Sequence, residues 1–248
     1  MAGNVATGGP AKVATRSGFF LYISLGFLAI ALIGFSTTFF LPLARGTFVA
    51  PPVIYVHGAL LFAWLILLIA QASLIRVRNV SVHRRLGWLG ASLAIAIVIS
   101  GIAVFLHVTR RDLATGGGDV VLRLFVSNLL TMLTFGSLVA AAVVLRRDSE
   151  SHKRLLLLAT ILVLDPAWGR FGNLFPAFES LEGFFFTIPS YSLAVIAIAR
   201  DLVAYRRVHP VYIWVGGLLV AVDMTAPFAS QSAAWLRVAR WLLGEAAV

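Results

Sequence analysis

The sequence predicts an all-α protein, a polytopic transmembrane helix bundle of about seven spans with a short C-terminal interfacial helix. Of its 248 residues, 60% are hydrophobic and only 12% are charged, about half the charged share of a soluble domain. The mean hydropathy of +0.95 excludes water as the solvent for most of this surface. The apolar residues also gather in stretches that reach, or nearly reach, the roughly 20 residues of a membrane-crossing helix.

Seven such stretches follow one another along the chain. They are Gly18–Leu43, Pro52–Ile75, Leu86–Val108, Val121–Leu145, Leu155–Phe175, Gly183–Tyr205 and Val211–Phe228. The first is too long for the core of a signal peptide, about 7–15 residues, and is interpreted as a retained span. Pro52 suits a helix start, and Pro189 predicts a kink in the sixth span. The seventh is the most polar because it contains Asp223.

The chain therefore divides into three parts. Residues 1–17 are rich in Gly, Ala and Thr without periodicity, and we expect a disordered N-terminal tail. Residues 18–228 form the transmembrane helix bundle. Residues 229–248 form a C-terminal amphipathic segment, in which Trp235 and Trp241 alternate with Arg237 and Arg240. A helix of this kind lies at the membrane interface.

The loop charges predict the orientation. With the N-terminus inside, 13 Lys and Arg lie on the inner side and 6 on the outer side, which fits the excess of basic residues in cytoplasmic loops. We therefore expect a multi-pass protein of the bacterial inner (plasma) membrane, with a cytoplasmic N-terminus and the C-terminus outside. The net charge of +10 is then explained by these loops and by contact with membrane lipids.

Composition also excludes several functions. No basic segment is interleaved with stacking aromatic residues, so we expect no nucleic-acid partner. The absence of cysteine excludes disulfides, thiolate metal sites and cysteine nucleophiles. No phosphate-binding loop, Asp-rich metal motif or nucleophile elbow is present, and whether the chain is an enzyme stays open. A membrane-protein partner or a homo-oligomer is compatible with the small residues of the sixth span.

Polar residues inside the predicted spans indicate a first candidate site, an intramembrane cluster in the outer half of the bilayer. Depths follow from the rise of about 1.5 Å per residue in a helix. The cluster consists of His57, Asn128, Asp165, Arg170, Asn173 and Asp223. Buried charges need partners, so we expect Arg170 to pair with Asp223, or with Asp165 if the helix breaks before Pro166. A purely structural ion pair is the alternative.

A second candidate site lies at the inner ends of the spans. His83 and His152 each stand at the start of a span and are each followed by two basic residues, and Gln71 lies at a similar depth. The histidines are candidate metal ligands, and paired ligation would hold a haem b. Its propionates would then meet Arg84, Arg85, Lys153 and Arg154. Ordinary interfacial histidines next to topology-determining basic residues are the alternative.

These motifs resemble a known pattern. His57, Gln71, the run His83-Arg84-Arg85-Leu86-Gly87, the later His152-Lys153-Arg154 and Arg170 are similar to an uncharacterised family of bacterial multi-pass membrane proteins, which implies no established activity. The layout also resembles, more loosely, transmembrane b-type cytochromes with four ligating histidines. This chain has Asn128 where their outer haem needs a histidine, so that resemblance implies at most the inner haem.

Three functions therefore stay open. The first is a haem-binding or redox-linked membrane protein. The second is a proton-coupled small-molecule transporter that uses Arg170, Asp223, Asp165 and His57. The third is a non-catalytic accessory subunit of a membrane complex.

Overall fold

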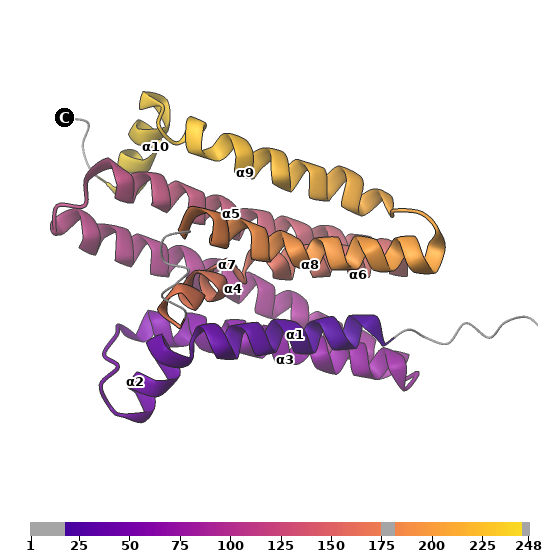
Figure 1. The fold of residues 1–248 in the computed structure, drawn as a ribbon. Coiled ribbons are helices and arrows are strands. Elements are labelled where there is room, and N and C mark those ends of the chain that lie inside the picture. Colours follow the sequence, from indigo (N-terminus) through magenta and orange to yellow (C-terminus); the bar gives the residue numbers. More distant parts are fainter. Residues whose placement is uncertain (1–17, 175–181, 245–248) are drawn as a thin grey trace, which may run out of the picture.

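The structure is a computed structural model that describes residues 18–174 and 182–244, without the side chains of 182–188 and of Pro227. Every regular element in these residues is a helix, which confirms the predicted all-α bundle (Figure 1). The elements are α1 (Phe19–Gly34), the π-helix η1 (Ser36–Phe40), α2 (Leu41–Ala44), α3 (Pro52–Arg76), α4 (Val80–Ala114), α5 (Gly118–Val144), α6 (Ser149–Leu162), α7 (Asp165–Trp168), the 3-10 helix η2 (Gly169–Asn173), α8 (Glu182–Tyr205), the π-helix η4 (Tyr212–Gly216), α9 (Gly217–Ala229) and α10 (Ala233–Leu243). The expected N-terminal tail lies outside the described residues.

The length and composition of the described helices identify a membrane protein with three to five candidate spans. α3, α4 and α5 are each long and apolar enough to cross a bilayer. Two further spans are added if α1 with η1–α2, and α6 with α7–η2, are each counted as one bent helix. The predicted seventh span is a shorter apolar helix, Tyr212–Ala226. Seven full spans are therefore not established.

Two predicted spans are broken rather than straight. The first bends by 48° between α1 and η1–α2, and the fifth bends by 41° between α6 and α7–η2. The second break falls just before Pro166, as expected, because proline lacks an N–H and disfavours helical geometry in the residue before it. The break places Asp165 at the first position of α7.

Consecutive helices form the body of the bundle. α3 packs on α4, α4 on α5 and α5 on α6, and α1 packs on α3. At the centre, the Trp64 ring meets Phe135 edge-on at 5.3 Å, and its Nε1 donates to Thr160 Oγ1 at 3.2 Å. These contacts hold α3, α5 and α6 together.

One end of the bundle carries most of the basic residues, and we call it the basic end. It lies at the right in Figure 1. Its basic residues are Arg76, Arg78, Arg84, Arg85, Arg146, Arg147, Lys153, Arg154, Arg200, Arg206 and Arg207. His83 and His152, predicted to stand at the starts of spans, lie in the first turns of α4 and α6. Asn79 and Asp148 cap these helices and so start them earlier than the apolar stretches do.

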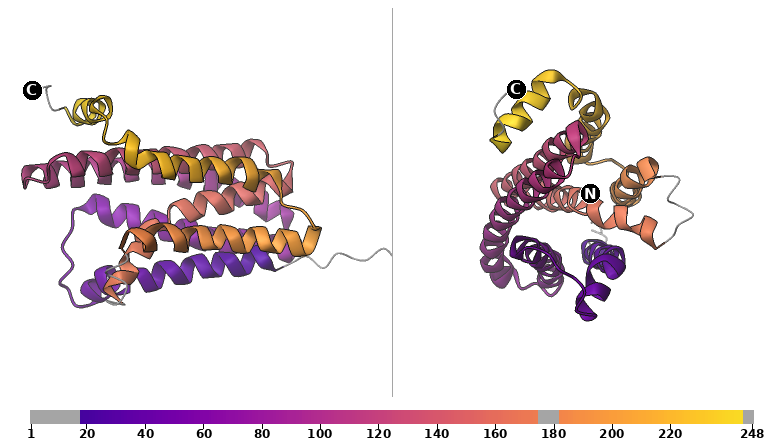
Figure 2. Two further views of the ribbon diagram at one scale, coloured as in Figure 1. Left: turned by 45° about the horizontal axis from the view of Figure 1, so that its top comes forward. Right: turned by 90° about the vertical axis from the view of Figure 1, so that its left-hand side faces the viewer.

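α9 and α10 lie at the periphery (Figure 2). α10 is capped by Ser232 at its start and by Gly244, with φ of 75°, at its end. Its Ala239 and Leu243 are buried against Leu122 and Phe125 of α5. α9 makes few contacts with the body of the bundle, and Leu218 and Phe228 are exposed. Space is therefore left between α9 and its neighbours.

Candidate functional site

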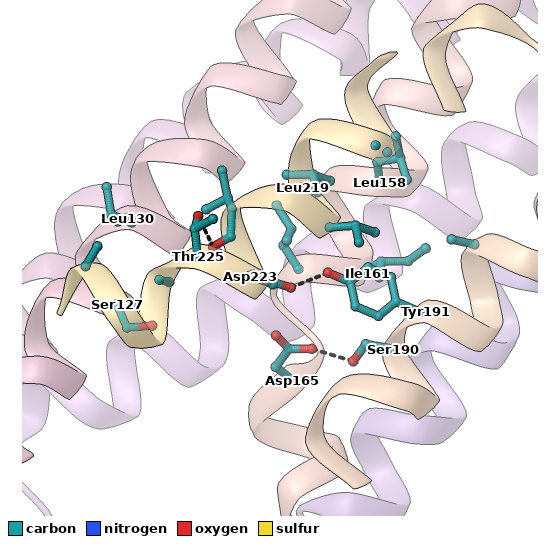
Figure 3. A pocket seen from close by; sticks show the side chains of 18 of the residues that line it. Ser127, Leu130, Leu158, Ile161, Asp165, Ser190, Tyr191, Leu219, Asp223 and Thr225 are labelled. Atoms are coloured by element: carbon teal, nitrogen blue, oxygen red, sulfur yellow. Dashed lines mark hydrogen bonds between the residues drawn. The ribbon is translucent and has the colours of Figure 1, made fainter. Parts of the chain in front are cut away.

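That space is a cavity of about 910 Å³ between α5, α6–α7, α8 and α9 (Figure 3). Most of its wall is apolar, and examples are Leu130, Leu158 and Leu219. Polar side chains in its wall include Ser127, Asp165, Ser190, Tyr191, Tyr212, Asp223 and Thr225, with Arg123, Ser230, Gln231 and Trp235 toward the α10 end. The volume is within the range of roughly 300–1,000 Å³ usual for ligand sites.

The helix break puts the first carboxylate into this cavity. Asp165 follows the interrupted end of α6 and accepts a hydrogen bond from the Ser190 hydroxyl of α8. Ser190 is adjacent to Pro189, the proline inside α8. The contact therefore joins the break between α6 and α7 to the part of α8 that contains a proline.

The second carboxylate comes from α9. Asp223 accepts a hydrogen bond from the Tyr191 hydroxyl, as Figure 3 shows. The nearby Thr225 turns its own hydroxyl back to the Ala221 carbonyl at 2.8 Å. Tyr191 therefore links α8 to a helix that otherwise stands away from the bundle.

Asp165 and Asp223 are close enough to interact electrostatically. Among the described residues, neither carboxylate has a Lys or Arg within salt-bridge distance. Two like charges in an apolar cavity, compensated only by hydroxyl groups, favour the uptake of a proton or a cation between them. This is the electrostatic property that distinguishes the cavity from the rest of the bundle.

The predicted pairing of Arg170 with Asp223 was wrong, and so was the alternative with Asp165. Arg170 donates to Thr38 Oγ1 at 3.1 Å and to the Pro166 carbonyl, and its guanidinium lies 4.3 Å from the centre of the Phe35 ring. The broken fifth span turns Arg170 toward the break in the first span, away from α9. A straight fifth span would place Arg170 at the depth of Asp223, whereas the 41° bend redirects its side chain.

The other members of the predicted cluster also separate. His57 Nδ1 lies 3.0 Å from Ser100 Oγ, so His57 contacts α4 rather than the cavity. Asn128 is half-buried in α5 and Asn173 is exposed in η2, and neither lines the cavity. Only Asp165 and Asp223 of the six predicted residues come together at one site.

At the basic end the structure brings together the residues of the second predicted site. The His83 and His152 rings interact electrostatically, and the Gln71 side chain lies near Gly87, one turn after His83. His152 Nδ1 lies 2.7 Å from the Ala142 carbonyl oxygen. The approach of His83 to His152 with Gln71 nearby was predicted, whereas a haem between them stays a prediction.

The basic residues assigned to haem propionates have other surroundings. Arg154 is fully buried, and its guanidinium forms a two-pronged ion pair with Asp201 at 2.6–2.8 Å. It also meets Glu150 at 2.6 Å, and Lys153 binds the same Glu150. Arg84 and Arg85 are exposed.

Sequence reasoning missed three functional residues. Asp201, only 1% exposed, is the acidic partner of Arg154. An Asp next to Arg200 near the end of an apolar span is a signal that could have identified it. Ser190 and Tyr191 follow the predicted kink at Pro189. The signal that could have identified them is Asp165, a carboxylate that also stands beside a proline, Pro166.

Among the described residues, no group of three or more His, Cys, Asp and Glu side chains is placed to hold a metal ion. Comparison with known proteins finds no match in any family model, curated protein or solved structure.

Proposed function

We propose that the chain is a membrane carrier that exchanges a small lipophilic cation for protons in the cavity between α5, α6–α7, α8 and α9. The observation that carries the proposal is the pair of carboxylates, Asp165 and Asp223, which share one apolar cavity without a basic partner among the described residues. Their charge demands a positive partner, and the apolar wall favours a solute with a hydrophobic body.

The proposed exchange follows from coupled titration. In the empty cavity the two carboxylates retain a proton, because adjacent like charges in a low-dielectric site do not both ionise readily. A bound monovalent cation supplies the missing positive charge, so the proton leaves. The solute and the proton therefore compete for one site, which is the basis of proton-coupled exchange.

The architecture supports this proposal at a second level. Carriers commonly bind their solutes at interrupted helices near the middle of the membrane. Asp165 lies at such an interruption, between α6 and α7, and Ser190 lies beside Pro189 in α8.

The test measures cation binding and proton release together. Tetraphenylphosphonium binding to the purified protein in detergent is followed by equilibrium dialysis, and proton release by a pH-sensitive dye in weak buffer. We expect saturable binding with release of up to one proton per cation, lost in Asp165→Asn and in Asp223→Asn. Asp112→Asn is the matched control, since Asp112 is exposed and pairs with Arg111.

Proteoliposomes with an imposed pH gradient complete the test. We expect accumulation of ethidium, a fluorescent lipophilic cation, by the wild type and by Asp112→Asn, and background uptake by the two cavity variants. Binding and uptake that survive both cavity substitutions in folded protein would refute the proposal, as would a wild type that binds neither probe.

A further inference from the structure

Three side chains from three helices meet at the basic end, away from the cavity. They are His83 of α4, His152 of α6 and Gln71 of α3. The two rings interact electrostatically. The Gln71 amide lies next to Gly87, one turn after His83, because a Cβ on that glycine would be 4.0 Å from Gln71 Nε2.

The hydrogen bond of His152 determines where its proton lies. Its Nδ1 is 2.7 Å from the Ala142 carbonyl oxygen, in the last turn of α5. A carbonyl oxygen can only accept, so Nδ1 carries the hydrogen and donates it. In the neutral ring, Nε2 therefore holds a free lone pair.

His83 has a ring nitrogen without a partner. Its Nδ1 is buried and makes no hydrogen bond within the described residues. In the neutral ring that carries its hydrogen on Nε2, this Nδ1 holds a lone pair. The side-chain oxygen of Gln71, Oε1, is also buried without a partner. Because buried polar atoms are normally satisfied, these two atoms indicate a missing partner.

The three groups therefore offer lone pairs. His83 Nδ1, His152 Nε2 and Gln71 Oε1 are two imidazole nitrogens and one amide oxygen. Such a set needs an electron-pair acceptor. Histidines that bind metals almost always donate their other N–H to a carbonyl, carboxylate or water, which orients the ring. Imidazole nitrogens suit Zn²⁺, Cu²⁺ and Ni²⁺.

We propose that His83, His152 and Gln71 bind one divalent transition-metal ion at the basic end, with solvent completing its coordination. The surrounding positive charge does not forbid this. Arg154 is neutralised by Asp201 and Glu150, and Arg84 is exposed. Gln71 argues for an ion rather than a haem, because two axial histidines leave a haem iron no position for a third protein ligand. The proposal is independent of the proposed carrier function.

The probe is Cu²⁺, which binds nitrogen ligands most tightly among the first-row divalent ions. Untagged protein in detergent is titrated by calorimetry and then examined by electron paramagnetic resonance. We expect one tight site per chain and a spectrum with splitting from two imidazole nitrogens. His83→Ala and His152→Ala should each weaken binding by at least about 10-fold, and Gln71→Leu should weaken it less.

His107→Ala is the matched control, because His107 lies near the opposite end of α4 from His83. This substitution should not change the affinity. The nitrogen splitting of the wild-type spectrum keeps the test decisive even if a ligand variant fails to fold. A spectrum without two coordinated imidazoles, equal affinity in His83→Ala, or a haem absorption band in the purified wild type that His83→Ala removes would each overturn the metal-ion proposal.

Discussion

The bundle contains two groups of acidic residues that are stabilised in opposite ways. At the basic end, Asp201 is held by both nitrogens of the Arg154 fork, and the pair is almost completely buried. In the cavity, the half-buried Asp165 and the exposed Asp223 interact electrostatically, and their partners among the described residues are hydroxyl groups, those of Ser190 and Tyr191. The charge of Asp201 is neutralised by Arg154, and we call these two residues the closed pair. Asp165 and Asp223 still need a positive charge, and we call them the open pair. A closed pair organises packing, and an open pair is suited to binding.

The largest expected effect is the loss of one partner of the closed pair. Asp201→Ala leaves Arg154 buried without its main counter-charge, and we expect a loss of about 3–5 kcal/mol in the free energy of unfolding. Asp223→Ala, the comparison from the open pair, should change it by no more than about 1 kcal/mol. Denaturant unfolding in detergent measures both, and equal losses would remove the distinction between the two groups.

Removing both members of the closed pair should cost less than removing one. Buried ion pairs are often replaced by apolar residues at little cost, because the desolvation penalty also disappears. We expect Arg154→Met combined with Asp201→Leu to recover at least about 2 kcal/mol relative to Asp201→Ala alone. A double variant as unstable as the single one would show that Glu150 or the ring contacts of Arg154 contribute more than the pair.

A smaller effect is expected from the hydroxyl partner of the open pair. Tyr191→Phe removes the donor that orients Asp223. The cation must then order this carboxylate itself, and we expect an affinity loss of about 5-fold, equivalent to about 1 kcal/mol. Tetraphenylphosphonium dialysis measures it, with Tyr205→Phe at the basic end as control. Unchanged affinity in Tyr191→Phe would show that the hydroxyl does not position Asp223 for binding.

The smallest effect concerns a carboxylate outside the membrane that also has only polar donors. At the start of α6, the Ser151 hydroxyl and the backbone N–H groups of Glu150 and Ser151 donate to Asp148 and lower its pKa from 3.8. A lowered pKa adds stability above the unfolded value, and this is lost as the pH falls through the folded value. Asp148→Asn should therefore be less stable than wild type at pH 6, and the gap should narrow toward pH 3. A constant gap would contradict this cause.

The sequence was sufficient to predict the helical class and the approximate positions of the helices, because apolar stretches determine both. It also predicted the break before Pro166, since proline acts locally. It did not predict the partner of Arg170, because a bend of 41° redirects every later side chain. Depth along a straight helix placed Arg170 and Asp223 in one layer, but the bend turns Arg170 toward Thr38 of the first span. Asp201 was overlooked because its significance depends on Arg154, 47 residues away.

The interruption before Pro166 also has a consequence for hydration. In an uninterrupted helix, the residue four positions later would donate a hydrogen bond to the carbonyl of Leu162. That residue is Pro166, which has no backbone N–H. Lipid tails cannot replace the missing donor, so irregular backbone at this depth is tolerated only beside protein or water. Leu162 borders the cavity, and we therefore expect a water molecule to enter there. We expect the proline that positions Asp165 also to hydrate its surroundings, so that a proton leaving the carboxylates would pass first to this water.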